Sequence, residues 1–182
     1  ENKMKFKKIW EGDWVSIVSP VEHDYEALHE MNGVLIVPIL YDKDQPLIGI
    51  RKEFCPPYFI KGHKPDSGLF YTAISGGVED KEDPETAAFR ELKEEAGIIP
   101  ISYSVTELYK EINFVKNTDA LSSCYLMKIY TYDKEKPKGD GTENEEKSKT
   151  IWVSHKRLKT LLKEKNIDLL FHLVGSIANG VL

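Results

Sequence analysis

Cysteines and long apolar runs are scarce in this sequence. Only two of its 182 residues are cysteine, Cys55 and Cys124, which is too few for a disulfide scaffold or a zinc cluster and typical of reduced thiols. No uninterrupted apolar run approaches the ~20 residues that a membrane span needs. Residues 1–14 lack the apolar core of a secretion signal. We therefore expect a cytoplasmic protein that does not insert into a membrane.

The sequence also lacks an excess of positive charge. Its 25 lysines and arginines are outnumbered by 30 aspartates and glutamates, which gives a net charge of −5. A mildly acidic chain has no broad basic face for duplex nucleic acid, so that class of partner is disfavoured. With 41% hydrophobic and 30% charged residues, the composition is that of a folded globular protein. The length suits a single domain over residues 1–182.

Local patterns predict a mixture of strands and helices. Strands are expected over 13–19, 33–41, 47–51, 69–74, 104–114, 122–132 and 151–153, and helices over 84–96, 155–164 and 168–179. Pro38 indicates an edge strand or a bulge, Ser75–Gly77 is predicted to be a tight turn, and 25–30 is ambiguous. Strands mixed with few helices indicate an α+β or α/β sandwich.

Residues 133–150 contain no member of the hydrophobic set AVILMFWYC. Such a stretch cannot pack against a core, so it is predicted to be a long solvent loop. Loops of this length inside a compact domain are usually functional or disordered.

The helix predicted over 84–96 has clear signals at both ends. Asp83 can cap its free amides, and Pro84 suits the first helical position, where the missing N–H costs nothing. Gly97 is a natural residue just beyond the C-terminal end.

Acidic residues are concentrated in and before this helix. Residues 79–95 hold eight of the 30 carboxylates, and Glu91, Glu94 and Glu95 project from one helix face because they are three and four residues apart. Like charges this close are either solvated or hold cations. Carboxylate oxygens at this spacing suit Mg²⁺ or Mn²⁺, which prefer oxygen ligands.

Two neighbouring features can complete such a site. Arg90 is four residues before Glu94 and eight after Glu82, so it can brace either carboxylate. The glycines of 75–77 let the backbone approach the cluster, and a backbone carbonyl there can serve as a further ligand.

The stretch 76–98, GGVEDKEDPETAAFRELKEEAGI, resembles the Nudix box. The family pattern is Gly, five residues, Glu, seven residues, Arg-Glu, an aliphatic residue, any residue, Glu-Glu, any residue, Gly and an aliphatic residue. Nine residues fill every fixed place: Gly76, Glu82, Arg90, Glu91, Leu92, Glu94, Glu95, Gly97 and Ile98. A match at nine spaced positions is far more specific than a lone glycine motif.

This resemblance implies an α/β/α sandwich with a mixed sheet, and hydrolysis of a nucleoside diphosphate linked to another group. It implies Mg²⁺ as cofactor, with Mn²⁺ as a substitute. Carried over residue by residue, Glu91 and Glu95 are the principal metal ligands, Glu94 is a further ligand or a catalytic partner, and the carbonyl of Ser75 is the backbone ligand. The resemblance makes Glu82 and Arg90 an orienting pair.

Beyond the box, the chain resembles the ADP-ribose and ADP-sugar pyrophosphatase branch from about Trp10 to its C-terminus. The segment 11–15 resembles a strand whose tryptophan, here Trp14, stacks on adenine, and Tyr25 stands where a second stacking aromatic occurs. The stretch 52–57 resembles the strand and diproline turn of that branch. Arg51 and Lys52 are accordingly expected to bind substrate.

Two further expectations come from that branch. The stretch 140–143 resembles the loop that brings a catalytic carboxylate over the metals, which makes Glu143 the first choice for the base and keeps Glu145 and Glu146 as alternatives. In that branch the N-terminal strands, here about residues 4–30, cross to a partner subunit, so a homodimer is implied.

Several departures bear on the substrate. Cys55 stands where the branch has an arginine, and Glu30 or His29 stands where another is expected; 119–122 replaces a Pro-Gly-Leu-Ser stretch. The expected substrate is ADP-ribose or another ADP-sugar, giving AMP and a sugar phosphate. The alternatives are a nucleoside triphosphate, a dinucleoside polyphosphate or a capped RNA end. A non-enzymatic nucleotide sensor is disfavoured because the box keeps all its carboxylates.

Overall fold

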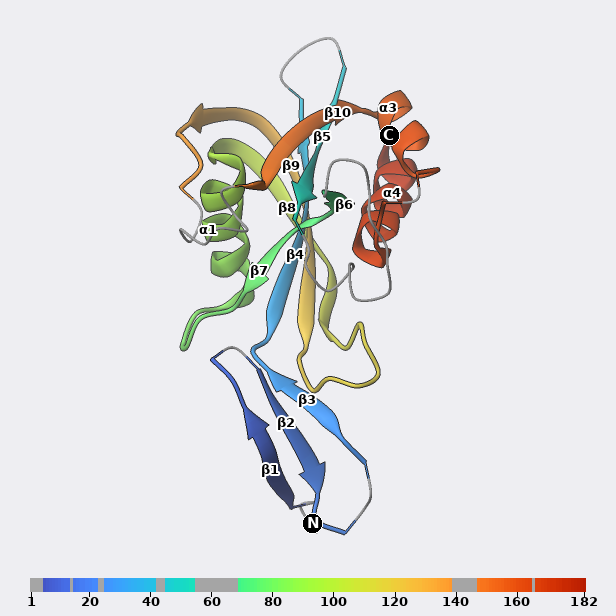
Figure 1. The fold of residues 1–182 in the computed structure, drawn as a ribbon. Helices are drawn as coiled ribbons and strands as arrows, with labels where there is room; N and C mark the ends of the chain where they lie inside the picture. The colour runs from blue at the N-terminus through green and yellow to red at the C-terminus, as the bar shows by residue number, and fades with distance from the viewer. Residues whose placement is uncertain are drawn as a thin grey trace.

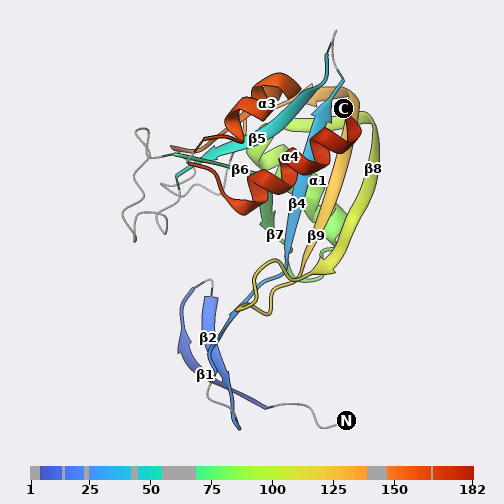
Figure 2. The ribbon, with the colours of Figure 1, turned by 90° about the vertical axis from the view of Figure 1, so that its right-hand side faces the viewer.

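The structure is a computed structural model that describes residues 5–13, 15–22, 25–41, 45–54, 69–138, 147–164 and 166–182. Two sheets are present in these ranges (Figure 1). The smaller sheet, which we call the arm, projects from the rest of the molecule (Figure 2). The arm consists of antiparallel strands in the order β1 (Phe6–Glu11), β2 (Val15–Pro20) and β3 (Ala27–Glu30).

The larger sheet has seven strands with the main order β10-β5-β4-β9-β8. Its strands are β4 (Gly33–Leu40), β5 (Leu47–Glu53), β6 (Phe70–Thr72), β7 (Ile74–Gly77), β8 (Ile98–Ile112), β9 (Ser122–Lys134) and β10 (Lys149–Ser154). Strand β6 pairs with β5, and β7 pairs with β4. The sheet is mixed, because β4 and β9 run parallel whereas the other pairs are antiparallel.

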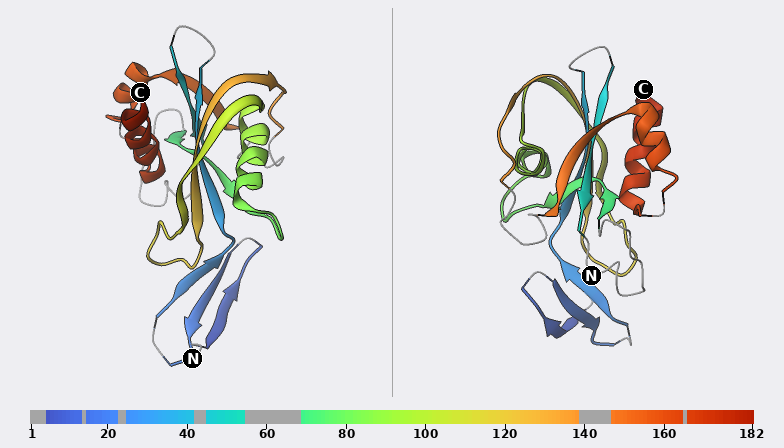
Figure 3. Two further views of the ribbon diagram at one scale, coloured as in Figure 1. Left: turned by 180° about the vertical axis from the view of Figure 1, so that it is seen from behind. Right: turned by 45° about the horizontal axis from the view of Figure 1, so that its top comes forward.

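Helices cover both faces of this sheet (Figure 3). Helix α1 (Pro84–Ala96) lies on one face, and α3 (His155–Leu161) and α4 (Leu169–Val181) lie on the other. Strand β4 serves both cores, because successive side chains alternate between the faces. Val34 and Ile36 pack with α1, whereas Leu35 and Val37 pack with α3 and α4. The predicted α/β/α sandwich with a mixed sheet is therefore confirmed.

Pro38 lies in a central strand, so the prediction of an edge or a bulge was wrong. On one side β4 pairs with β9 through its whole length. On the other side it pairs with β7 from Gly33 to Ile36 and with β5 at Ile39 and Leu40. Proline has no N–H to donate, and it stands at the position where β4 changes partners.

The predicted turn at Ser75–Gly77 is instead part of strand β7, paired with Gly33–Leu35 of β4. The glycines serve close approach rather than a turn. A Cβ at Gly76 would run into the Glu91 carboxyl group, and one at Gly77 would run into the sulfur of Met31.

The other elements follow the predictions with different ends. Strand β8 begins at Ile98, directly after α1, rather than near residue 104. The loop predicted over 133–150 is shorter than expected, because β9 continues through Lys134 and β10 begins at Lys149. Residues 139–146 lie outside the described part of the chain. Among the described residues, no helix is long and apolar enough to cross a membrane.

Candidate active site

Helix α1 is fixed at both ends as its sequence predicts. The Asp83 carboxylate accepts a hydrogen bond from the backbone N–H of Thr86 at 3.0 Å, and its hydrogen bonds with Thr86 lower the pKa of Asp83. Pro84 is the first helical residue, and Gly97 ends the helix in the left-handed region with φ of 65°. Between these ends Ala88 and Leu92 are buried against the sheet, which places Glu95 on the same buried face.

Arg90 lies at the centre of the box carboxylates. It donates two hydrogen bonds to Glu82, at 3.0 and 2.9 Å, and one each to Glu91 at 2.6 Å and Glu94 at 3.1 Å. It also donates to the carbonyl of Gly77 at 2.7 Å. The Arg90 hydrogen bonds lower the pKa of Glu82, and the same contacts raise the pKa of Arg90. The guanidinium thus ties the helix to β7 and holds three carboxylates around it.

Glu95 faces the sheet and meets Arg51 of β5. Arg51 is 4% exposed and Glu95 is 9% exposed, and Arg51 Nε lies 3.2 Å from Glu95 Oε2. The backbone carbonyl of Glu95 accepts a hydrogen bond from the Thr150 hydroxyl at 2.8 Å. Arg51 is therefore buried beside a predicted metal ligand. Its neighbour Lys52 is half-buried, with its Nζ 5.6 Å from the centre of the Tyr71 ring.

The donors near α1 suit a hard divalent cation. Glu91, Glu94 and Glu95 supply carboxylates, and the Glu91 carboxylate lies against the backbone of β7 at Gly76, directly after Ser75. All these donors are oxygens, the type that Mg²⁺ and Mn²⁺ prefer. Within the described ranges, no three acidic, histidine or cysteine side chains already converge as a metal cluster. The glutamates turn instead toward Arg90 and Arg51.

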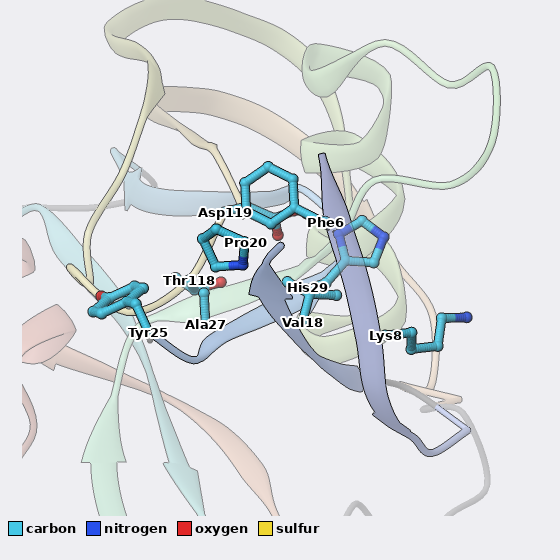
Figure 4. A pocket seen from close by; sticks show the side chains of 9 residues that line it. All are labelled: Phe6, Lys8, Val18, Pro20, Tyr25, Ala27, His29, Thr118 and Asp119. Atoms are coloured by element: carbon cyan, nitrogen blue, oxygen red, sulfur yellow. Dashed lines mark hydrogen bonds and ion pairs between the residues drawn. The ribbon is translucent and has the colours of Figure 1, made fainter. Parts of the chain in front are cut away.

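A cavity of about 660 Å³ lies between the arm and the connection from β8 to β9 (Figure 4). It is lined by Phe6, Lys8, Val18, Pro20, Tyr25, Ala27, His29, Thr118 and Asp119. Tyr25 is exposed, and its hydroxyl donates to the side-chain oxygen of Asn117 at 3.3 Å. The predicted site residues Trp14, Glu143, Glu145 and Glu146, and the departure at Cys55, lie outside the described residues.

The arm is attached to the body through the connection 113–121. His29 Nδ1 is 2.5 Å from a carboxylate oxygen of Asp119, and the backbone N–H of Glu30 donates to the same carboxylate at 3.2 Å. The Glu30 side chain accepts from the Thr118 hydroxyl at 2.6 Å. His29 and Glu30, the two candidates for the place of the second expected arginine, thus both hold the arm. Sequence reasoning missed Thr118 and Asp119, whose partners are about 90 residues away.

The cavity and the box helix are linked through the end of β3. The chain leaves β3 after Glu30, and Met31 then lies close to Gly77. The backbone N–H of Val78 donates to the carbonyl of Asn32 at 2.8 Å. Since Gly77 accepts a hydrogen bond from Arg90, a few residues separate the wall of the cavity from the glutamates of α1.

Cys124 is buried in the core, and burial raises its pKa to about 12. A thiol with such a pKa stays protonated near neutral pH and is a poor nucleophile. Cys124 is therefore a core residue rather than a reactive thiol.

Fold and site together define the class of protein. A mixed sheet lies between two helical layers. On one of these layers, helix α1 presents glutamates that hydrogen-bond to Arg90, as the box predicts. A family model of the NUDIX domain matches residues 31–173, well over half of the chain. The chain belongs to the Nudix family and is a Nudix hydrolase, an enzyme class that acts on nucleotide small molecules and generally uses divalent metal ions. The predicted family and enzyme class are confirmed.

The comparison with solved structures shows the same fold. A crystal structure described as an ADP compounds hydrolase matches with a TM-score of 0.63 and 17% identity, over 97% of this chain and 93% of that one. Because 261 solved chains match, this likeness identifies a fold rather than a substrate. A comparison with curated proteins found no match.

Proposed function

We propose that this hydrolase cleaves the pyrophosphate bond of a nucleoside diphosphate derivative, ADP-ribose or another ADP-sugar, to give AMP and a sugar phosphate. The observation that carries this proposal is the cluster of Glu82, Glu91 and Glu94 around Arg90, in which the box pattern is complete. The ADP-containing substrate is supported by the description of the structural neighbour as an ADP compounds hydrolase and by the resemblance of residues 11–15 and 140–143 to the ADP-sugar branch.

The metal ligands in this proposal are the carboxylates of Glu91, Glu94 and Glu95 and the carbonyl of Ser75, and the ion is Mg²⁺ with Mn²⁺ as a substitute. When bound, divalent ions supply positive charge that offsets the charge of the pyrophosphate and polarises its phosphoryl oxygens. Arg90 contributes by orientation. Its two hydrogen bonds to Glu82, at 3.0 and 2.9 Å, fix the guanidinium, and its remaining N–H groups then set where Glu91 and Glu94 point.

A group that accepts the proton of the attacking water is also needed. We assign this role to Glu143, with Glu145 and Glu146 as alternatives. The described chain that leads toward these residues supports the assignment, because it is bonded to the C-terminal end of α1. The backbone N–H of Lys138 donates to the carbonyl of Glu94 at 3.2 Å, and that of Glu135 donates to the carbonyl of Gly97 at 2.8 Å.

The cavity beside the arm is our candidate for the nucleobase site. Its volume of about 660 Å³ is within the range of roughly 300–1,000 Å³ typical of small-molecule sites. Phe6 and Tyr25 bring aromatic rings to its lining. Trp14, which lies between β1 and β2 in the sequence, is proposed as a further stacking residue. Lys52 is proposed to contact the substrate from β5.

The arm is proposed to form a homodimer with a second copy of the chain. Large apolar side chains are exposed along the arm and its flanks: Phe6, Ile9, Trp10, Val21, Tyr25, Leu28 and Met31. An exposed apolar surface of this kind is typical of an interaction site, and the outer strand β1 presents an edge that another strand can pair with.

A panel of nucleotide substrates tests the proposed reaction. The purified chain is incubated with ADP-ribose, other ADP-sugars, a nucleoside triphosphate, a dinucleoside polyphosphate and capped RNA, with Mg²⁺ or Mn²⁺, and the products are separated by chromatography. AMP and a sugar phosphate from an ADP-sugar are expected. Faster hydrolysis of the triphosphate, dinucleotide or cap would contradict the substrate class, and no metal-dependent hydrolysis of any of them would contradict the reaction.

A further inference from the structure

The ion pair between Arg51 and Glu95 differs from the Arg90 cluster in its burial. Both residues are at least nine-tenths buried, and Arg51 Nε lies 3.2 Å from Glu95 Oε2. Arg51 comes from the middle of the sheet, where it stands opposite Thr72 of β6 and Thr150 of β10. Alternation along β5 places Arg51 on the α1 side, the side to which Leu47 also packs.

Because both side chains are buried, the energetic effect of this contact is large. An arginine keeps its charge under all ordinary conditions, and a buried charge is costly unless it is paired. At 4% exposure Arg51 has little access to solvent or to a substrate in the cavity. Its side chain contacts the carboxylate of Glu95 instead.

Resting on the proposed function, in which Glu95 is a metal ligand, we infer that Arg51 is a positioning residue that serves as the counter-ion of Glu95 when no metal is bound. One carboxylate charge is then shared between two cations. Arg51 offsets the negative charge of Glu95 inside the protein and repels a divalent ion that approaches the same group. The residue stabilises the metal-free protein and weakens its affinity for the metal.

The two arginines divide the box glutamates between them. Arg90 contacts Glu82, Glu91 and Glu94 from a partly exposed position, whereas Arg51 contacts Glu95 from inside the sheet. Each of these carboxylates therefore has a cationic partner before any metal arrives. This arrangement explains how carboxylates crowded on one helix face can coexist in a stable metal-free fold.

The test measures Mn²⁺ binding and thermal unfolding of the full chain without substrate. R51M removes the cation and keeps much of the apolar stem. Its melting temperature without metal should fall by on the order of 10 °C, because the charge of Glu95 loses a buried partner. Its Kd for Mn²⁺, measured by calorimetry, should fall roughly tenfold, because the competing charge is gone.

A merely structural role would lower the melting temperature without tightening Mn²⁺ binding. An unchanged or raised Kd for R51M, while the wild type binds Mn²⁺, would therefore overturn the inference and leave the proposed function standing. If the wild type itself binds no Mn²⁺, the proposed metal site fails and the inference fails with it. The two failures are thus distinguishable.

Three further variants keep the test decisive. R51Q is expected to show the same change in Kd and replaces R51M if that variant does not fold. R51K retains the positive charge and should keep the Kd within about twofold of wild type. The double variant R51M/E95Q should regain more than half of the melting temperature lost in R51M; purely additive losses would overturn the pairing. R157M, at an exposed arginine of α3, is the matched control and should change neither quantity appreciably.

Discussion

The Arg90 cluster of the box helix and the arm are held by contacts of opposite reach. Every partner of the Arg90 side chain lies within 13 residues of it in sequence, whereas the arm is bonded through His29 and Glu30 to residues about 90 positions away. The two regions also differ in how far their side chains are buried. Helix α1 packs Ala88 and Leu92 into the core, whereas every residue of β1 is exposed.

This difference shows which region has its charges paired and its apolar side chains buried within a single chain. In the box helix, the glutamates pair with Arg90 and Arg51, and the apolar face is buried against the sheet. The arm leaves Phe6 and Trp10 more than half exposed, so it is the region expected to gain from a partner. Four experiments test this difference between the two regions.

The largest effect is expected for E95Q. The amide keeps the shape of the side chain but removes the charge that the proposed metal requires, and metal catalysis supplies several kcal/mol. Turnover should therefore fall roughly a hundredfold or more. The matched control is E85Q, at an exposed glutamate in the first turn of the same helix that fills none of the fixed places of the box. Wild-type turnover of E95Q at saturating Mg²⁺ would remove Glu95 from the site.

G76A should lower turnover roughly tenfold or more, because a displaced group costs about that much in a well-oriented site. Its new Cβ would run into the Glu91 carboxyl group, which must move away from β7. Since a flexible side chain can yield, the melting temperature should change little. G180A is the control: its Cβ meets nothing within 4 Å, so it should keep full turnover and gain about 0.5–1 kcal/mol of stability. Unchanged turnover in G76A would show that the position of Glu91 is not critical.

The arm should determine the oligomeric state. Sedimentation of the wild type at micromolar concentration is expected to give about twice the chain mass of 20.8 kDa. F6E places a charge on the exposed edge strand of the arm and should shift the mass toward that of one chain. I101E introduces the same charge at an exposed isoleucine of β8 and should leave the dimer intact. A wild-type monomer with full activity would contradict both the dimer and a shared nucleobase site.

The smallest effect concerns acid stability. Arg90 lowers the pKa of Glu82 below its ordinary value of 4.5, so this group stabilises the fold above pH 4.5, and the stabilisation is lost as the pH falls through the lowered pKa. E82Q should cost about 1 kcal/mol or less at neutral pH, because solvent screens the site. Urea titrations should show this difference shrinking as the pH falls below 4.5 and vanishing once Glu82 is protonated in the folded protein. E79Q, at a more exposed carboxylate 3.9 Å from Arg90, should show a smaller difference at neutral pH.

The contrast also explains what the sequence could predict. Helix α1 and its capping residues were predicted because their signals are local, and the contact of Arg90 with Glu94 follows from helical spacing. The contact between Arg51 and Glu95 was not foreseen, because it depends on how β5 is placed against α1. A strand's own residues carry little information about its distant partner.

The arm and β8 were less predictable for the same reason. Strand β1 is short of apolar alternation and exists through its pairing with β2. Strand β3 depends in turn on Asn117 and Asp119, which bond to the backbone of Leu28. The start of β8 was not predicted, because proline is disfavoured inside a strand and Pro100 lies near its beginning. In the structure the pairing of β8 with β9 shifts register at Pro100, which absorbs the missing donor.

Pro38 has a consequence during synthesis of the chain. Strand β4 pairs in parallel with β9, and Gly33 lies opposite Ser122, so the apolar run 33–41 must wait for residues made much later before its central pairing forms. A nascent apolar segment of high β-propensity is an aggregation hazard. A proline within such a run interrupts intermolecular pairing. Because β4 changes partners at this position, the proline costs the folded sheet little. In the nascent chain the same proline protects the segment 33–41 from aggregation.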